Sequence, residues 1–425
     1  MNRTPHRLLP ALLIIIPALL QTHPTQAITL SGRWLSSAYT SEHAVSDSLS
    51  ERHLPAYQGL SLNIGQLAGG KGELRTYILG HRDFLAQGAG NYLKLSHLYF
   101  RLRDIGGLAS VTLGRQFAYA GVARGMMDGL RLDLRLPVGF KLRGYAGAIP
   151  VLDNGLKLNS WSRSNMVGGR LALPGIKGTV LAVSYVRKNK NPIAYGIPGA
   201  FSLRETNYSS LREHLLGIDV QSDLPGSIRL SGRLDHNLEL KRTRRLILES
   251  SYRHRSGFDI RGYFMSREPY VYPNSIFSVF SQQPYKEAGG RVGYRLSPTL
   301  RVYGGVSRVF FRDENSTSLN VGASLASGYL SYSRRIGYSG EANSLTLGLK
   351  QPLRPGLWAL ADVNYSNYQL YEDSPKFDAV WAGVGVSVQP VRNATIDFQI
   401  QRLNNRVYQS DYRFLARSQV WFFRK

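Results

Sequence analysis

The chain has 425 residues, a formal net charge of +25 at pH 7 and no cysteine. The absence of cysteine excludes disulfides, thiolate catalysis and cysteine-ligated zinc. Of the 53 basic residues, 41 are arginine. Arginine binds carboxylate, sulfate and phosphate through a planar fork of donors, so the composition points to anionic partners.

The first segment has the three parts of a secretory signal. Arg3 and Arg7 precede an apolar run over residues 8–20, and a polar stretch follows. The run is shorter than the roughly 20 residues that a spanning helix needs, and two prolines interrupt it. We predict that residues 1–27 form a signal peptide and residues 28–425 the mature protein; an uncleaved anchor helix is the alternative. Because export separates the chain from nucleic acid, we expect no nucleic-acid partner.

Apolar and polar residues alternate in segment after segment of the mature chain. In residues 130–136, four leucines alternate with Arg131, Asp133 and Arg135. A strand places such leucines on one face, whereas a helix would scatter them around its circumference. The pattern predicts about 22 strands, near residues 28–37, 57–66, 72–81, 92–103, 108–117, 130–136, 140–146, 165–173, 178–187, 213–222, 228–234, 243–254, 258–264, 286–295, 300–307, 318–326, 328–336, 343–350, 356–367, 378–389, 395–401 and 412–424. The alternation is blurred in residues 93–103, which indicates either a β-bulge or a misassigned strand.

The length of these segments favours a membrane barrel. Strands of about 9 to 12 residues match a tilted bilayer crossing better than the usual five or six. No later segment is long and apolar enough for a spanning helix, and 25 tyrosines, many near strand ends, are typical of aromatic girdles. We therefore predict an all-β protein, a single transmembrane antiparallel up-and-down β-barrel of about 18–22 strands in the bacterial outer membrane. A soluble β-sandwich or propeller is the alternative, but no periodic blade motif is present.

The predicted connections alternate between short and long. Short links rich in proline and glycine lie at residues 173–177, 296–298 and 353–356, whereas long polar stretches lie at 150–164, 188–212, 265–286, 311–317, 366–378 and 403–411. This alternation is the turn and loop asymmetry of outer-membrane barrels. The stretch 265–286 contains five aromatic residues and three prolines, and we hypothesise that it folds inward to narrow the pore or presents a glycan platform at the surface. A disordered loop is the alternative.

No motif indicates catalysis. Gly65, Gly70 and Lys71 form part of a phosphate loop, but residue 72 is glycine and no helix follows, so we interpret the segment as a hairpin turn. The nine histidines show no metal-ligand spacing, and no Gly-x-Ser-x-Gly motif occurs. We predict that the protein is not an enzyme and holds neither a metal nor a cofactor.

Three short motifs resemble one known group of proteins. They are Leu113-Gly114-Arg115-Gln116, then Asp128-Gly129-Leu130-Arg131-Leu132, then Leu142-Arg143-Gly144-Tyr145-Ala146-Gly147. The stretch 74–148 that contains them resembles the N-terminal strands of porin-like, alginate-export-like outer-membrane proteins. The resemblance implies a strand that ends in Gly-Arg-Gln, followed by a loop and a hairpin that starts at Asp-Gly. It covers under a fifth of the chain and implies the class without a substrate.

Basic side chains supply the predicted functional site. If the apolar stripes face lipid, the alternate positions face the lumen, because arginine at mid-membrane costs roughly 2 to 4 kcal/mol. The predicted pore-lining residues are Arg115, Arg131, Asp133, Arg135, Lys141, Arg143, Arg229, Arg233, Arg261, Arg291, Arg295 and Arg301.

This pattern predicts a porin-like channel for passive passage of small, preferentially anionic solutes. Alternatively, the arginines pair with Asp133, Glu249, Asp259 and Asp397 as ladders across a plugged interior. A non-conducting barrel that acts as a surface scaffold or docking partner is the second function. The expected partners are outer-membrane lipid and lipopolysaccharide, the barrel-assembly machinery and small anionic solutes, whereas the sequence does not fix the oligomeric state.

Overall fold

The computed structural model describes residues 28–46, 49–85, 91–151, 157–175, 178–190, 195–198, 203–206, 211–269, 283–312, 314–337, 340–370, 374–408 and 410–424. The predicted signal peptide lies outside these residues. In the part described, no helix is long and apolar enough to cross a bilayer.

Twenty-two long strands build the fold. They are β1 (Thr29–Tyr39), β4 (Pro55–Leu67), β5 (Gly72–Asp83), β6 (Tyr92–Ile105), β7 (Ala109–Ala120), β8 (Ala123–Arg135), β9 (Lys141–Ala148), β10 (Ser164–Pro174), β11 (Thr179–Lys190), β14 (Leu211–Leu224), β15 (Ile228–Asn237), β16 (Arg242–Arg253), β17 (Phe258–Arg267), β18 (Tyr285–Arg295), β19 (Leu300–Phe310), β20 (Asn315–Leu325), β21 (Gly328–Gly337), β22 (Ala342–Arg354), β23 (Leu357–Gln369), β24 (Lys376–Val391), β25 (Ala394–Asn404) and β26 (Asp411–Arg424). Two small hairpins, β2 (Ser41–Ser46) with β3 (Leu49–His53) and β12 (Tyr195–Pro198) with β13 (Leu203–Thr206), and the 3-10 turn η1 (Pro137–Gly139) complete the elements.

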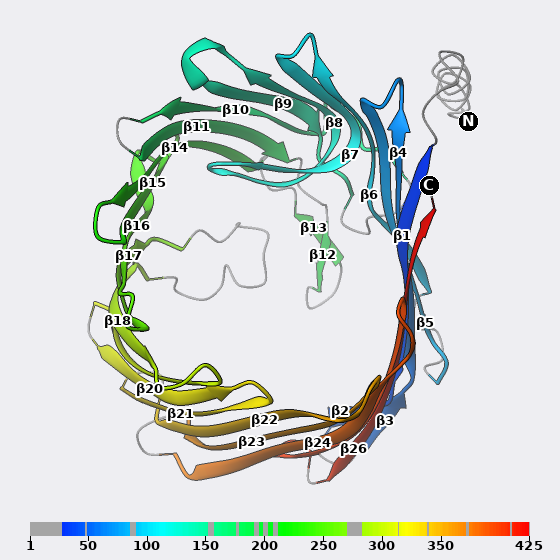
Figure 1. Ribbon diagram of the computed structural model, residues 1–425, viewed down its shortest axis with the longest axis vertical. Helices are drawn as coiled ribbons and strands as arrows, with labels where there is room; N and C mark the ends of the chain where they lie inside the picture. The colour runs from blue at the N-terminus through cyan, green and yellow to red at the C-terminus, as the bar shows by residue number, and fades with distance from the viewer. Residues whose placement is uncertain are drawn as a thin grey trace.

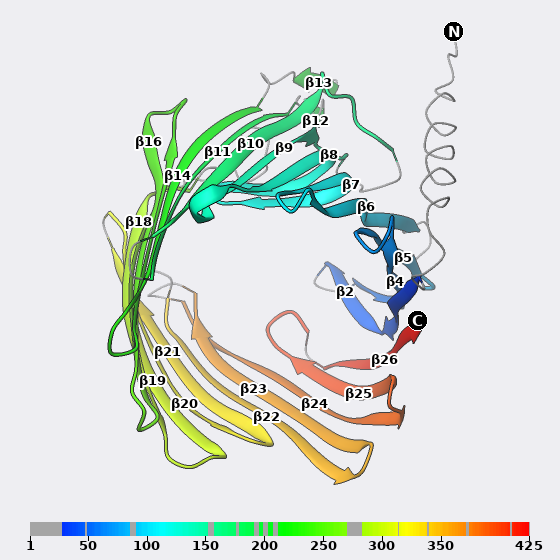
Figure 2. The same ribbon diagram turned by 45° about the horizontal axis from the view of Figure 1, so that its top comes forward.

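The long strands close into a ring. Each is antiparallel to the next long strand in the chain, and β26 returns to pair with β1, with Leu35 opposite Gln419. Figure 1 looks down this ring, with the red β26 beside the blue β1, and Figure 2 shows it tilted. The predicted all-β, up-and-down barrel is confirmed at 22 strands, and every predicted strand overlaps one of them.

A β-bulge explains the blurred alternation in β6. Tyr77 of β5 is opposite His97, and the next residue, Ile78, is opposite Leu95, so that Ser96 is the extra residue. A bulge shifts the side-chain alternation by one position, because two residues of one strand then oppose one residue of its partner. The strand was therefore predicted correctly, and the bulge accounts for its irregular pattern.

The two ends of the barrel differ in the length of their connections. At the end that holds Thr29 and Arg424, the connections are short, including residues 68–71 at the partial phosphate-loop motif and the predicted turns at 175–178, 296–299 and 355–356. At the other end lie the six long stretches predicted from the sequence. We call these the turn end and the loop end. The hypothesis that 265–286 folds inward falls mainly on residues 270–282, which lie outside the described residues.

One hairpin leaves the wall. β7 pairs with β6 only up to Arg115, and β8 pairs with β9 only from Asp128 onward, so residues 116–127 pair only within their own hairpin. Figure 1 shows this cyan hairpin turned into the ring beneath β11 and β14. We call residues 116–127 the inward hairpin. It forms the buried core of the barrel, because Ala118, Ala123 and Met127 pack against Met166 and Val186 of the wall.

Candidate functional site

The inward hairpin identifies the inner face of the sheet. Its tip contacts Ser184 of β11, where the backbone N–H of Val122 donates to the Ser184 Oγ at 3.1 Å. Side chains directly opposite each other in neighbouring strands share a face, so the register extends this assignment around the ring. Ser184 of β11 is opposite Gly217 of β14, and Gly217 is opposite Asp235 of β15. The same step from strand to strand leads around all 22 strands to Arg170 of β10, which is again opposite Ser184. The inner face is therefore assigned consistently over the closed ring.

The outer face is apolar. Between inner-face positions, the strands present exposed side chains such as Leu113, Leu130, Val306, Leu345 and Phe398, which are 46–58% exposed. Leu113 is opposite Leu130 in the register, so apolar residues meet apolar residues across strands. An exposed apolar belt of this kind is what a lipid-facing surface requires.

Glycine makes the bend of the inward hairpin possible. Gly114 has φ +120°, and a Cβ there would lie 2.4 Å from the backbone oxygen of Leu98. At the tip, Gly121 has φ +62°, and its Cβ would lie 2.0 Å from the Ser184 Oγ. L side chains rarely adopt either conformation, and neither position has room for one. The close approach of the tip to the wall therefore depends on glycine.

Basic wall residues hold the hairpin through its backbone oxygens. Arg233 donates to the Gly121 oxygen at 2.7 Å, Lys188 donates to the Arg124 oxygen at 2.8 Å, and Arg143 donates to the Tyr119 oxygen at 2.8 Å. Hydrogen bonds from charged donors are stronger than neutral ones. The hairpin is thus fixed at three points by inner-face cations, two of which were predicted from the sequence.

The other side of the hairpin carries two exposed aromatic rings. Phe117 is 48% and Tyr119 is 65% exposed, and their ring centroids are 6.2 Å apart. Because the opposite side of the hairpin packs on the wall, these rings face the interior of the ring. A solute that passes the hairpin would meet two aromatic rings.

Eleven of the twelve predicted site residues lie on the inner face. Arg131, Asp133 and Arg135 of β8 are opposite Tyr145, Arg143 and Lys141 of β9, and Arg143 is opposite Arg170. Across the ring, the same face carries Arg229, Arg233, Arg261, Arg291, Arg295 and Arg301.

Arg115 is a correction. Its side chain is 3% exposed and forms an ion pair with Asp128, with Nε 2.7 Å from Oδ1. It also donates to the backbone oxygens of Leu95 and Lys157, so it fills the place where the hairpin leaves the wall. The Asp128-Gly129 pair does not start a hairpin either, because it lies within β8 and the tip is at Gly121. Arg115 therefore supports the hinge and is not exposed to the pore.

Carboxylates neutralise about half of the predicted basic residues. Asp133 pairs with Arg131 and Arg143, and Asp259 pairs with Arg301 at 2.6 Å. Further pairs join Arg229 to Asp223 at 2.6 Å and Arg233 to Asp219 and Asp235 at 3.5 and 2.9 Å. Of the four acids named in the ladder interpretation, Asp133, Asp259 and Asp397 pair with arginines, Asp397 with Arg417, whereas Glu249 accepts a hydrogen bond from Ser231.

Five predicted basic residues make no ion pair with any other described residue: Arg135, Lys141, Arg261, Arg291 and Arg295. Arg261 is directly opposite Arg291, although like charges in this position destabilise a sheet. In the other Arg–Arg pairs of the described strands, at least one arginine is bound to an aspartate. The Arg291 guanidinium instead lies 3.9 Å from the centre of the Tyr303 ring.

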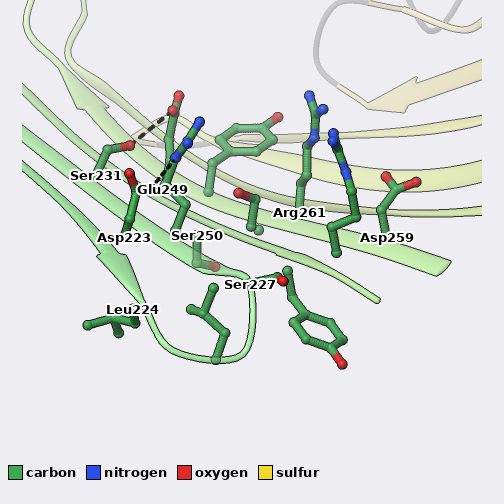
Figure 3. A pocket seen from close by; sticks show the side chains of 15 residues that line it. Asp223, Leu224, Ser227, Ser231, Glu249, Ser250, Asp259 and Arg261 are labelled. Carbon is green, nitrogen blue, oxygen red and sulfur yellow. Dashed lines mark hydrogen bonds and ion pairs between the residues drawn. The ribbon is translucent and has the colours of Figure 1, made fainter. Parts of the chain in front are cut away.

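A hollow of about 710 Å³ lies beside this pair, on the turn-end side of the inward hairpin. Figure 3 shows Ser231, Glu249, Asp259 and Arg261 projecting to one side of its wall, while Leu224 projects to the other. Ser231 donates to Glu249 at 3.4 Å. A second hollow reaches from here to the hairpin tip at Gly121. Polar and charged groups thus line the wall from the hairpin toward the turn end.

Among the described residues, no group of three or more His, Asp or Glu side chains is placed to hold a metal ion.

Comparison with known proteins identifies the fold. No protein-family model and no curated protein matches the chain. The ferric enterobactin receptor PfeA of Pseudomonas aeruginosa, as a double mutant, is similar over 92% of this chain and 80% of its own, with a TM-score of 0.60 and 10% identity. A chain of an E. coli P pilus tip assembly intermediate, PapC-PapD-PapK-PapG, is similar over 95% of this chain and 62% of its own, with a TM-score of 0.51 and 9% identity. P. aeruginosa OpdK with vanillate is similar over 93% of this chain and 99% of its own, with a TM-score of 0.45 and 10% identity.

At these identities the likeness concerns the fold, which is that of a large β-barrel. The resemblance to alginate-export-like proteins stays a prediction.

Proposed function

We propose that the protein is a passive, porin-like channel of the bacterial outer membrane that prefers small anionic solutes. The observation that carries this proposal is the contrast between the two faces of one closed ring. The outer face is apolar, and the face around the interior carries arginines, such as Arg261 and Arg291, that make no ion pair with another described residue. An apolar exterior favours lipid, and a polar interior with an excess of positive charge concentrates anions.

The proposal includes export through residues 1–27, assembly by the barrel machinery and passage without catalysis or a cofactor. The inward hairpin narrows the pore in this proposal, and the basic residues beside it attract anions. Weak binding at several sites lets a solute enter and leave, which conduction requires.

Planar-bilayer recordings of the purified protein test the channel. We expect discrete conductance steps, and in a potassium chloride gradient we expect a reversal potential of the sign that chloride permeation produces. Absence of steps in repeated preparations of folded protein would overturn the channel and favour the scaffold function.

The double substitution Arg261→Gln with Arg291→Gln tests the charge claim, because it removes two inner cations that form no ion pair with another described residue. We expect the chloride-to-potassium permeability ratio to fall by about twofold or more. The matched control is Arg392→Gln with Arg424→Gln, since residue 392 lies in a turn and Arg424 faces outward at the end of β26. Equal reversal potentials in the two variants would contradict the charge claim.

A further inference from the structure

The outer face carries most of its basic side chains at one end of the barrel, whereas at the turn end the outward basic positions of the described strands are Arg354 and Arg424. Seven exposed basic residues occupy outward positions within three residues of the loop end of their strands: Arg82, Arg187, Arg212, Lys286, Arg308, Arg334 and Arg402. The remaining outward positions of these seven strands carry no Asp, Glu, Lys or Arg. We call the seven residues the outer basic belt. It lies beyond the apolar belt, at the level where a membrane meets water.

The charges of the outer basic belt have no carboxylate partners among the described residues. Near them, one carboxylate of the described strands occupies an outward position, that of Asp378. It accepts hydrogen bonds from Tyr365 and Asn367. Cations that have no carboxylate partner at a membrane surface are available to an external anion.

Aromatic rings hold three of these guanidinium groups along the surface. Arg82 lies 5.0 Å from the ring centre of Phe84, Arg308 lies 5.4 Å from that of Phe310, and Arg402 lies 5.7 Å from that of Tyr412. Such contacts attract the cation to the ring and leave the donors at the edge of the guanidinium available. The three arginines are thereby ordered for an anion at the level of the headgroups.

A surface hollow adds a place for a headgroup. It measures about 360 Å³ and is lined by Arg187 together with Trp161, Asn165, Val167 and Tyr185. Val167 is directly opposite Arg187, and both occupy outward positions. The hollow thus combines apolar and aromatic walls with one cation, which suits an amphiphile.

The uneven distribution of the belt identifies the kind of lipid. If both membrane surfaces carried equal numbers of long basic side chains, the tendency of these side chains to extend toward water would be a sufficient explanation. A belt at the loop end indicates that the leaflet there is richer in phosphate than the leaflet at the turn end. Arginine forks match phosphate geometry and bind it through charge-assisted hydrogen bonds.

We propose that the outer basic belt binds the phosphate groups of a phosphorylated glycolipid leaflet, and so fixes the loop end toward that leaflet. This inference rests on the membrane location in the proposed function, and it is independent of conduction. It assigns the loops to the outside of the cell and the short turns to the periplasm.

Lipid binding by the purified full-length protein tests the belt. The protein in neutral detergent is incubated with bisphosphorylated lipid A, with its dephosphorylated form or with phosphatidylglycerol, and bound lipid is measured after gel filtration. The wild type should retain bisphosphorylated lipid A and release the other two. The triple variant Arg308→Gln, Arg334→Gln, Arg402→Gln should bind it about tenfold more weakly.

The matched control removes the same number of charges from the inner face, by Arg261→Gln, Arg291→Gln and Arg295→Gln, and should bind lipid A as the wild type does. Folding of each variant is checked by the heat-dependent shift of its mobility in gels. Equal binding by the two triple variants, or equal retention of the dephosphorylated lipid or of phosphatidylglycerol, would overturn the proposal. If the wild type retains lipid A but shows no conductance, the channel fails while the belt stands.

Discussion

Among the described residues, Glu73 is the carboxylate with the most arginine partners. It accepts from Arg75 at 3.0 Å, from Arg101 at 3.2 Å and from Arg103 at 2.5 Å, and its side chain is 8% exposed. Arg101 also donates to Thr112 on the next strand, so the network joins β5, β6 and β7. Removal of this one charge leaves three cations close together without an anion.

We expect Glu73→Gln to lower the free energy of unfolding by about 2 kcal/mol, less than for a fully buried group because the arginines are partly solvated. Urea unfolding in lipid vesicles, followed by tryptophan fluorescence, measures this change. The control is Glu341→Gln, which breaks an exposed pair with Lys376 and should cost under about 1 kcal/mol. A Glu73 variant no less stable than the control would show that the network does not stabilise the fold.

Residue faces were predictable where alternation is regular. Arg131, Asp133 and Arg135 alternate with leucines, so their shared inner face followed from the period of two. Arg115 was assigned to the pore although it follows Val111 and Leu113 at a spacing of two, so the same alternation places it on the outer face with Leu113. The available signal for the hairpin was the segment from Ala118 to Ala123, in which four of the six residues are alanine or glycine, so that the pattern of large apolar side chains is interrupted.

At the scale of elements, the inward hairpin was the feature that the sequence did not reveal. A hairpin that extends past its neighbours and one that folds inward have the same local pairing, since β7 and β8 stay in register up to Ala120 and Ala123. Its position depends on contacts with β11, β14 and β15, which are distant in sequence. The strands and the long loops were predictable because periodicity and turn residues are local.

A disulfide tests the docked position of the hairpin. A Cβ at Gly217 would lie 2.3 Å from the Cγ1 of Val122, so cysteines at these two positions should be within bonding reach. We expect Val122→Cys with Gly217→Cys to form the bond on mild oxidation, seen as altered mobility in non-reducing gels. The native chain has no cysteine to compete.

The control pair is Val122→Cys with Gly383→Cys, because Gly383 occupies an inner position on β24, away from the hairpin. Equal cross-linking in both pairs would mean that the hairpin moves through the lumen. Cross-linking in neither would mean that it does not dock on β14.

At the scale of the whole molecule, the two faces predict opposite responses to the same new charge. Val321 and Asn320 are neighbours in β20 on the outer and inner faces. We expect Val321→Arg to lower the free energy of unfolding in vesicles by about 2 to 4 kcal/mol, and Asn320→Arg to change it by under about 1 kcal/mol. Urea titration of both variants in the same vesicles measures the difference. Equal losses would contradict the assignment of faces.

The position of the inward hairpin constrains the order in which the barrel is made. Its contacts use β8 to β15, all in the first two thirds of the strands, and the seam between β26 and β1 forms from the two ends of the chain. The hairpin can dock while the sheet is still an open, curved ribbon. Once the seam has closed, it could enter only through an end of the cylinder. Early docking would also bury the Ala and Met side chains that would otherwise be exposed on an unfinished sheet.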